Sequence, residues 1–220
     1  MDEKNIKSVL QILIDIESVE SELLKIYFNE IFELSKKIIS NPNFEDKKIK
    51  EMGFELLISI IEDIPSIVEE SSLSYEIIYS IFNLMLNYSL NFDKNVDMNS
   101  FDFITEIDYD SEQYFIEEEI NYASLLSERL FESIESSFYQ KAFQTFVTNY
   151  FNKSWKNQYI ILILVISYSK YNEDINFFKQ LFESIPDLLI SSQNKIRFAS
   201  LYCFKNFLIK YKSNFLEKYL

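Results

Sequence analysis

The side chains in this sequence that could do chemistry are almost all carboxylates. Asp and Glu number 35 against 21 Lys and Arg, which gives a net charge of −14 at neutral pH. Histidine is absent from the sequence, so Ser-His-Asp triads, Cys-His dyads and His-ligated metal sites are excluded. Two carboxylates could still act as general acid and base, but nothing in the sequence specifies a pocket around such a pair. We therefore expect no enzyme, no cofactor and no metal site.

The carboxylates gather in two segments that could bind a cationic ligand. In the first segment, Glu51, Glu55 and Glu62 share the polar face of an expected helix over 45–64. The second segment lies between Lys94 and Arg129, an interval without Lys or Arg. Its candidate binding residues are Asp102, Asp108, Asp110, Glu112, Glu117, Glu118 and Glu119. A negative field of this kind disfavours nucleic acid and favours basic protein partners.

Each acidic segment also has an interpretation without a ligand. The glutamates of 45–64 could simply form a solvated helix face, as most charge runs do. The acidic loop contains aromatic residues such as Phe101 and Tyr109, which could contact a partner or dock on the protein itself. A calcium site over 102–112 is rejected, because no register supplies the mid-loop Gly and final Glu of an EF-hand. Trp155 could hold a cation over its ring if it lies exposed beside the carboxylates; otherwise it packs.

Composition and apolar periodicity predict an all-α protein. The chain is 48% hydrophobic with one Gly and three Pro, so it has few residues for the tight turns of β structure. The apolar spacing predicts helices over 4–16, 21–40, 45–64, 73–89, 112–134, 136–151, 154–170, 173–191 and 194–211. Their short connections indicate antiparallel pairs, interrupted by one acidic insertion at 90–111.

Four residues or segments carry further structural expectations. Ser21 can cap the helix that begins there. Gly53 lies on an apolar face, where its helix-propensity cost of about 1 kcal/mol suggests close approach of a neighbouring helix. The run 159–166 is apolar nearly all round and needs cover on several sides, yet it is far too short to span a bilayer of about 30 Å. The lone Cys203 indicates a reducing, intracellular compartment.

An internal repeat favours a solenoid. The hexapeptide 155–160 superposes on 194–199 at a spacing of 39 residues. The segment 185–190, a polar turn and the segment 196–200 resemble the HEAT signature, which has Pro in its first helix, although the usual Asp of the turn is missing. We therefore expect a right-handed α-α superhelix of HEAT or armadillo type, a single array over 1–220 with about four to five repeats. A closed helical bundle would explain the apolar helix equally well.

The order of motifs resembles the karyopherins, the importin-beta superfamily, and most closely the importin beta-3 type. The segment 55–65 is similar to that family's "LEVIVTLAETAP" helix, 154–156 to "DWKYRHA", and 195–199 to "PRVRYAA". Further similarities lie at 32–34 and, around Ala123 and Leu130, to "A…LDRLA". Gln158 and Ile160 depart from the pattern, where the family has Arg and Ala.

This resemblance implies an interior segment of a nuclear import receptor. Such a receptor would shuttle between cytoplasm and nucleus, bind Lys/Arg-rich protein cargo on its concave face, and contact the GTPase Ran through other parts. It would bind no nucleic acid and would not insert into membranes. Missing neighbour repeats would leave apolar faces at both ends, which favours self-association. The alternative is a constitutive HEAT scaffold subunit of another intracellular complex.

Overall fold

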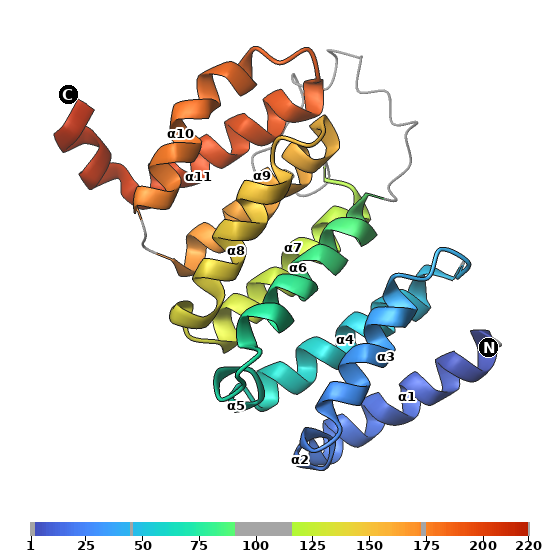
Figure 1. Ribbon diagram of the computed structural model, residues 1–220. Helices are drawn as coiled ribbons and strands as arrows, with labels where there is room; N and C mark the ends of the chain where they lie inside the picture. The colour runs from blue at the N-terminus through green and yellow to red at the C-terminus, as the bar shows by residue number, and fades with distance from the viewer. Residues whose placement is uncertain (1–2, 45, 91–115, 173–174, 220) are drawn as a thin grey trace. The chain divides into compact units, whose positions relative to one another are not determined.

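A computed structural model of the chain describes residues 3–44, 46–90, 116–172 and 175–219. Within these ranges the secondary structure is helical and contains no strand, which confirms the predicted all-α class. The helices are α1 Glu3–Glu20, α2 Glu22–Lys25, α3 Phe28–Ile39, α4 Lys47–Asp63, α5 Ser66–Glu69, α6 Ser74–Ser89, α7 Glu118–Ser133, α8 Ser136–Tyr150, α9 Trp155–Tyr171, α10 Ile175–Leu189 and α11 Asn194–Tyr219 (Figure 1). None of the described helices is long and apolar enough to cross a membrane.

The chain divides into two compact units. The first unit comprises Met1–Tyr88 and Glu128–Phe143, and the second comprises Ser89–Ser127 and Gln144–Leu220. The first unit therefore contains α1 to α6 with the end of α7 and the start of α8. The second unit contains α9 to α11 with the remaining parts of α7 and α8. The single HEAT array remains a prediction.

Helix α4 is the centre of the first unit. Both α1 and α3 pack against it, and α2 joins them. Its core side chains are fully buried: Phe54, Leu56, Leu57, Ile58, Ile60 and Ile61. On α6, the Phe82 ring lies 5.7 Å from the Phe131 ring and 5.0 Å from the Phe143 ring, measured between centroids. Burial of these apolar side chains, at about 25 cal/mol per Å², is the main stabilising term of the unit.

Helix α9 is the buried element of the second unit. Every residue from Tyr159 to Ile166 is at most 5% exposed, which confirms that this all-apolar helix is covered on several sides. It packs against α11, which also packs against α10. Helices α9 and α11 begin at Trp155 and Asn194, the two positions that the sequence repeat superposes. Pro186 lies in the last turn of α10, the place that a HEAT-type first helix would give it.

Local capping fixes where two of the predicted helices begin. The Asp46 carboxylate accepts a hydrogen bond from the Lys48 backbone N–H at 2.9 Å, before the first turn of α4. The Ser154 hydroxyl accepts one from the Asn157 N–H at 3.2 Å, before α9. Each cap satisfies a backbone donor that has no partner within its helix. The predicted starts at 45 and 154 therefore lie within two residues of the observed ones.

The predicted helix over 21–40 is wrong, because α2 and α3 are separate helices. Helix α1 continues to Glu20 rather than ending at 16, and Ser21 makes no capping hydrogen bond through its side chain. Both α1 and α3 pack on α4, so the chain has to reverse between them. In the absence of Gly and Pro the reversal uses a short helix and Tyr27, whose backbone leaves the helical region at φ −107° and ψ 10°.

Three other boundaries differ from the sequence prediction. Helix α5, Ser66–Glu69, follows Pro65 in a segment predicted as a loop. Helix α7 begins at Glu118, not at 112, and residues 112–115 lie outside the described ranges. Helix α11 continues to Tyr219, beyond the predicted end at 211. The last two differences change the lengths of predicted helices, and α5 adds a short helix between two of them.

The close contact predicted at Gly53 is present. Gly53 is buried on α4, and a Cβ atom added there would lie 3.3 Å from Ile39 Cγ1 and 3.6 Å from Ile39 Cδ1. The end of α3 therefore fills the space that a side chain at this position would occupy. This packing explains why a residue unfavourable in helices is present in α4.

Replacement of Gly53 by Leu should overpack the contact between α3 and α4. We expect a loss of about 1 to 3 kcal/mol in the free energy of unfolding, measured by urea titration followed by circular dichroism. The matched control is Asn29→Leu, which places the same side chain on the exposed surface of α3 and should change stability by less than about 0.5 kcal/mol. Equal stability of Gly53→Leu and wild type would show that the contact is loose.

Candidate protein-binding site

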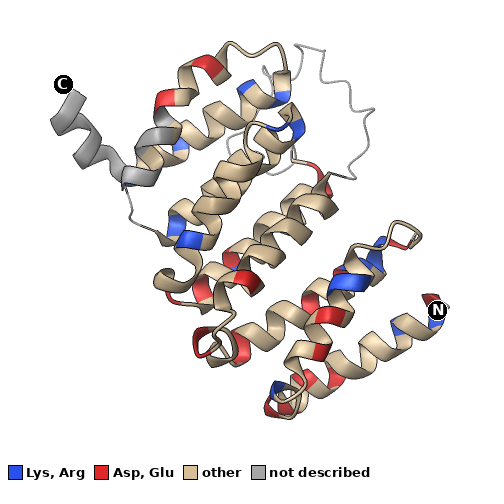
Figure 2. Ribbon diagram, viewed as in Figure 1, with Lys and Arg blue, Asp and Glu red and all other residues tan. Residues whose placement is uncertain are grey.

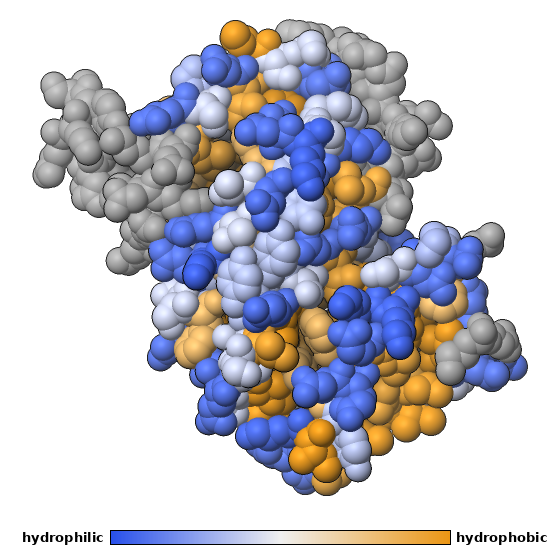
Figure 3. Space-filling model, in the orientation of Figure 1, coloured by the Kyte–Doolittle hydropathy of each residue, from blue (hydrophilic) through white to orange (hydrophobic). Residues whose placement is uncertain are grey.

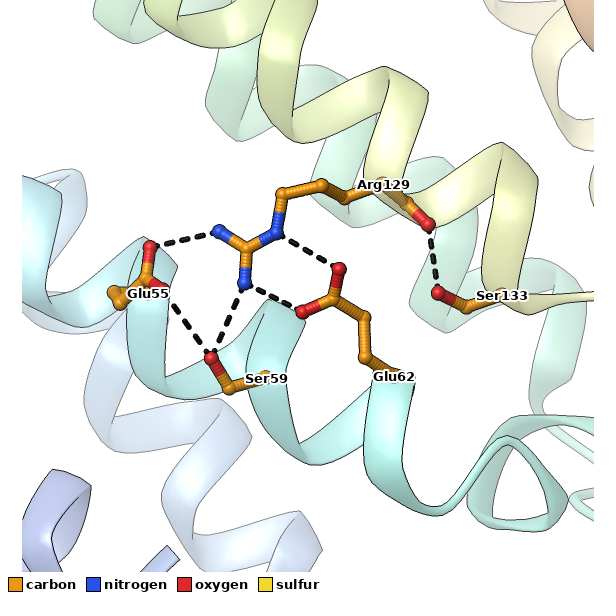
Figure 4. Close-up of polar contacts among 5 residues, drawn as sticks. All are labelled: Glu55, Ser59, Glu62, Arg129 and Ser133. Atoms are coloured by element: carbon orange, nitrogen blue, oxygen red, sulfur yellow. Dashed lines mark hydrogen bonds and ion pairs between the residues drawn. The ribbon is translucent and has the colours of Figure 1, made fainter. Parts of the chain in front are cut away.

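The polar face of α4 is occupied by an arginine from the same unit. Glu55, Ser59 and Glu62 are one or two turns apart and share this face. The Arg129 guanidinium of α7 donates to Glu62 Oε1 from Nε at 2.8 Å, to Glu62 Oε2 from Nη2, and to Glu55 Oε2 from Nη1 at 2.8 Å (Figure 4). Nη2 also donates to the Ser59 hydroxyl at 3.2 Å. The guanidinium therefore bridges two carboxylates at once.

This arginine is the cation that the sequence analysis assigned to an external ligand. The hydrogen bond from Arg129 to Glu62 is the largest influence raising the pKa of the guanidinium, so the cation is permanent. Its side chain is 31% exposed, and those of Glu62 and Glu55 are 29% and 41% exposed. Bidentate pairing with a carboxylate gives the contact defined geometry despite this partial exposure. Glu55 and Glu62 are thus already paired within the protein, although one guanidinium leaves the three groups with a net charge of −1.

Glu51, the third candidate on this face, also has internal partners. The Tyr88 hydroxyl donates to Glu51 Oε1 at 2.7 Å, and the Lys47 ammonium lies 3.9 Å from the same oxygen. Lys47 lies one helical turn before Glu51, the spacing at which oppositely charged side chains of a helix can pair. A basic ligand would have to displace these contacts to reach the carboxylate. The interpretation of Glu51, Glu55 and Glu62 as a solvated face without partners is therefore wrong, and their binding of a basic ligand stays a prediction.

Carboxylates nevertheless outnumber cations around Arg129. Glu17 of α1 is only 7% exposed, and its pKa is raised first by burial and then by the charge and hydrogen bond of Asp63, with smaller effects of Glu55 and Glu62. Asp63 itself is exposed at the end of α4. One guanidinium therefore pairs with two carboxylates, Glu17 and Asp63 add further negative charge beside Glu55 and Glu62, and the local field remains negative. In Figure 2, acidic residues also colour the turns around α2 and α5.

Sequence reasoning missed Arg129 and Glu17. Arg129 lies 67 residues from Glu62 and 74 from Glu55, so no local pattern joins them. Glu17 had a detectable signal, because it follows Ile6 and Leu10 at helical spacing on the buried side of α1. A glutamate on the apolar side of a helix is expected to be buried, and burial raises the pKa of its carboxyl group.

Replacement of Glu17 by Gln should remove a pH-dependent loss of stability. Because the pKa of Glu17 is higher in the folded than in the unfolded protein, the folded state binds the proton more tightly. The free energy of unfolding therefore falls as pH rises above the ordinary value of 4.5. We expect Glu17→Gln to have a higher Tm than wild type at pH 7, and the difference to vanish towards pH 4.

The control for this measurement is Glu20→Gln, an exposed position on the same helix. The Tm of this variant, relative to wild type, should not increase with pH. A Glu17→Gln advantage of equal size at pH 4 and pH 7 would mean that the amide stabilises through packing and not through loss of charge.

Glu117, a predicted binding residue of the acidic segment, is buried in the second unit. It forms an ion pair with Lys195, and the two side chains are 12% and 10% exposed. The Tyr159 hydroxyl donates to Glu117 Oε2 at 2.7 Å, and Lys195 Nζ lies 5.7 Å from the centre of the Tyr159 ring. Burial lowers the pKa of Lys195 and raises that of Tyr159. Glu117, which directly precedes α7, is thus in contact with side chains of α9 and α11 and is not a surface carboxylate.

Replacement of Lys195 by Met should strand the Glu117 carboxylate in the core. We expect a loss of about 3 kcal/mol in the free energy of unfolding, because removing one partner of a buried pair leaves an uncompensated charge. The double variant Lys195→Met/Glu117→Gln should recover most of this loss. The exposed pair of Lys36 and Glu33 supplies the control, since Lys36→Met should cost less than about 0.5 kcal/mol. A cost no greater than that of Lys36→Met would contradict the buried pair.

The remaining predicted binding residues divide into described and undescribed groups. Glu118 and Glu119 lie in the first turn of α7, where the helix dipole stabilises negative charge. Trp155 is 36% exposed at the start of α9, and Lys156 Nζ lies 6.0 Å from the centre of its ring. The cation near this ring thus comes from the neighbouring residue. Four candidates lie outside the described ranges: Asp102, Asp108, Asp110 and Glu112.

The cysteine of this chain is not placed for covalent chemistry. Cys203 is fully buried, which raises the pKa of its thiol and keeps it from acting as a nucleophile. Among the described residues, acids and cysteine form no cluster that could hold a metal ion.

Comparison of the chain with models of known protein families and with curated protein sequences gave no match. The resemblance to importin-beta receptors therefore stays a prediction from the sequence.

Proposed function

We propose that this chain is a non-catalytic helical scaffold of HEAT-repeat type that binds protein partners rich in Lys and Arg. The observation that carries the proposal is the surplus of acids on the first unit, where Glu17 feels the charges of Asp63, Glu55 and Glu62 and Arg129 pairs with the last two. A surplus of negative charge at the surface speeds encounter with a basic partner and disfavours an acidic one.

The repeat architecture is supported by two features of the second unit. Helices α9 and α11 start at the positions superposed by the sequence repeat, and α9 is covered as the inner helix of a repeat would be. Stacked helix pairs expose long faces, and proteins of this kind use such faces to bind extended partners.

Two forms of the function are compatible with this charge balance. The first is the receptor predicted by the resemblance to importins, which captures short Lys/Arg-rich cargo segments. The second is a constitutive subunit that binds one partner over a larger area. Internal pairing of Glu55 and Glu62 with Arg129 favours the second form, because a short peptide would have to compete with a bidentate intramolecular cation.

The proposal is tested by titrating the protein with a Lys-rich peptide of the nuclear-localisation type and with its scrambled form, at low and moderate salt. The key variant is Asp63→Lys, because Asp63 is exposed, whereas Glu55 and Glu62 are already paired with Arg129. The control is Glu30→Lys, which makes the same change of charge on the exposed surface of α3. We expect Asp63→Lys to bind the Lys-rich peptide about three- to tenfold more weakly than this control does.

The outcomes separate the two forms. Preference for the ordered peptide over the scrambled one, with dependence on Asp63, supports the receptor. Equal affinity for both peptides with dependence on Asp63 supports the constitutive scaffold. Equal affinities of Asp63→Lys and Glu30→Lys would overturn the proposal, because binding would then follow net charge alone.

A further inference from the structure

The outer face of α1 and α2 carries a continuous apolar row. Its five members are exposed large hydrophobic residues: Val9 at 45%, Ile12 at 57%, Ile16 at 36%, Val19 at 84% and Leu23 at 60%. Successive members are three or four residues apart, so the first four lie on one side of α1, and Leu23 follows in α2. Figure 3 shows apolar side chains gathered over this region, at the lower right of the view. We call these five residues the α1 stripe.

The α1 stripe is distinct from the core of the first unit. The core side of the same helices carries Ile6, Leu10 and Leu24, each at most 5% exposed. An open groove of about 360 Å³ runs along the outer side and is lined by Ile12, Asp15, Ile16, Val19, Glu20 and Leu23. Helix α1 is therefore apolar on two sides, although only one packs against α4. Exposed apolar surface of this extent and regularity marks a binding site.

The spacing of the α1 stripe fits a helical partner. Apolar residues that alternate between three and four apart form the seam along which two helices interlock side chains. The stripe runs from Val9 to Val19 along α1 and continues with Leu23 in α2. An extended strand would match it poorly, because strand side chains repeat every two residues.

The charges beside the α1 stripe select the partner. At the flanking helix positions lie Asp15, Glu20 and Glu22, and no Lys or Arg occurs between Lys7 and Lys25. A second copy of the chain would set these acids against each other in either helix orientation, so charge disfavours self-pairing. A helix flanked by Lys or Arg would instead form complementary pairs across both edges.

We infer that the α1 stripe binds an amphipathic helix of another protein, with apolar residues at the same spacing and Lys or Arg beside them. The inference rests on the proposed function and adds a second contact surface, with the chemistry of the helix that it binds. Apolar contact along the groove supplies affinity, while the flanking acids exclude acidic helices and orient basic ones.

The probe is a synthetic helical peptide of roughly three heptads with Leu and Ile in the seam and Lys at the flanking positions. A second peptide has the same seam with Glu at the flanks. Binding of each to the full chain is measured by fluorescence anisotropy. We expect the Lys-flanked peptide to bind at least about tenfold more tightly than the Glu-flanked one.

The protein variant Ile12→Ser/Val19→Ser removes two members of the stripe that do not belong to the core. It should weaken binding of the Lys-flanked peptide at least about tenfold and keep wild-type affinity for the extended Lys-rich peptide. The matched control is Leu201→Ser/Ile209→Ser, which removes two apolar residues of α11 that are 57% and 69% exposed. It should bind the helical peptide as wild type does.

Three results would overturn the inference. Equal affinity for the Lys- and Glu-flanked peptides would show that the stripe binds apolar helices without selecting their charge. Unchanged binding by Ile12→Ser/Val19→Ser would show that the peptide binds at another surface. Sedimentation showing a wild-type dimer that the same variant abolishes would make a second copy the occupant. If wild type binds the extended Lys-rich peptide but not the helical one, only this inference fails; if it binds neither, the proposed function fails too.

Discussion

The guanidinium of Arg129 is the interaction on which the first unit depends electrostatically. It satisfies Glu55 and Glu62 together and ties the end of α7 to the outer face of α4. Without it, α4 would carry like charges along one face while its opposite face is fully buried. The arginine lets an acidic helix lie at the centre of a compact unit, and it leaves the adjoining acids, Glu17 and Asp63, as the source of the remaining negative field.

This arrangement separates structural acids from acids that a partner can reach. Glu51, Glu55, Glu62 and Glu117 are held by Tyr, Arg or Lys side chains of the same unit. Exposed acids lie elsewhere on the first unit, at Asp63 and beside the α1 stripe. A basic partner would therefore meet its complementary charges next to exposed apolar surface. That combination gives both attraction at long range and contact area at short range.

The sequence predicted those features that depend on local pattern. The apolar run 159–166 required cover on all sides, and α9 is buried throughout it. Gly53 required a close neighbour, and Ile39 occupies that place. The break between α2 and α3 was not predictable, because no turn residue marks it and only the shared packing of α1 and α3 on α4 demands it. Partners such as Arg129 for Glu62, or Lys195 for Glu117, lie 67 and 78 residues apart, beyond the reach of helical periodicity.

The most direct test of the pairing of Arg129 with the glutamates of α4 is a double-mutant cycle between Arg129 and Glu62. Stability to urea is measured for wild type, Arg129→Met, Glu62→Gln and the double variant, with Lys36 and Glu33 as an exposed reference pair. If Arg129 occupies the place of a basic ligand, the coupling free energy between Arg129 and Glu62 should be at least about 1 kcal/mol. The coupling between Lys36 and Glu33 should be a few tenths of a kcal/mol. A coupling near zero between Arg129 and Glu62 would contradict this pairing, since Glu55 and Glu62 would then be available to an external cation after all.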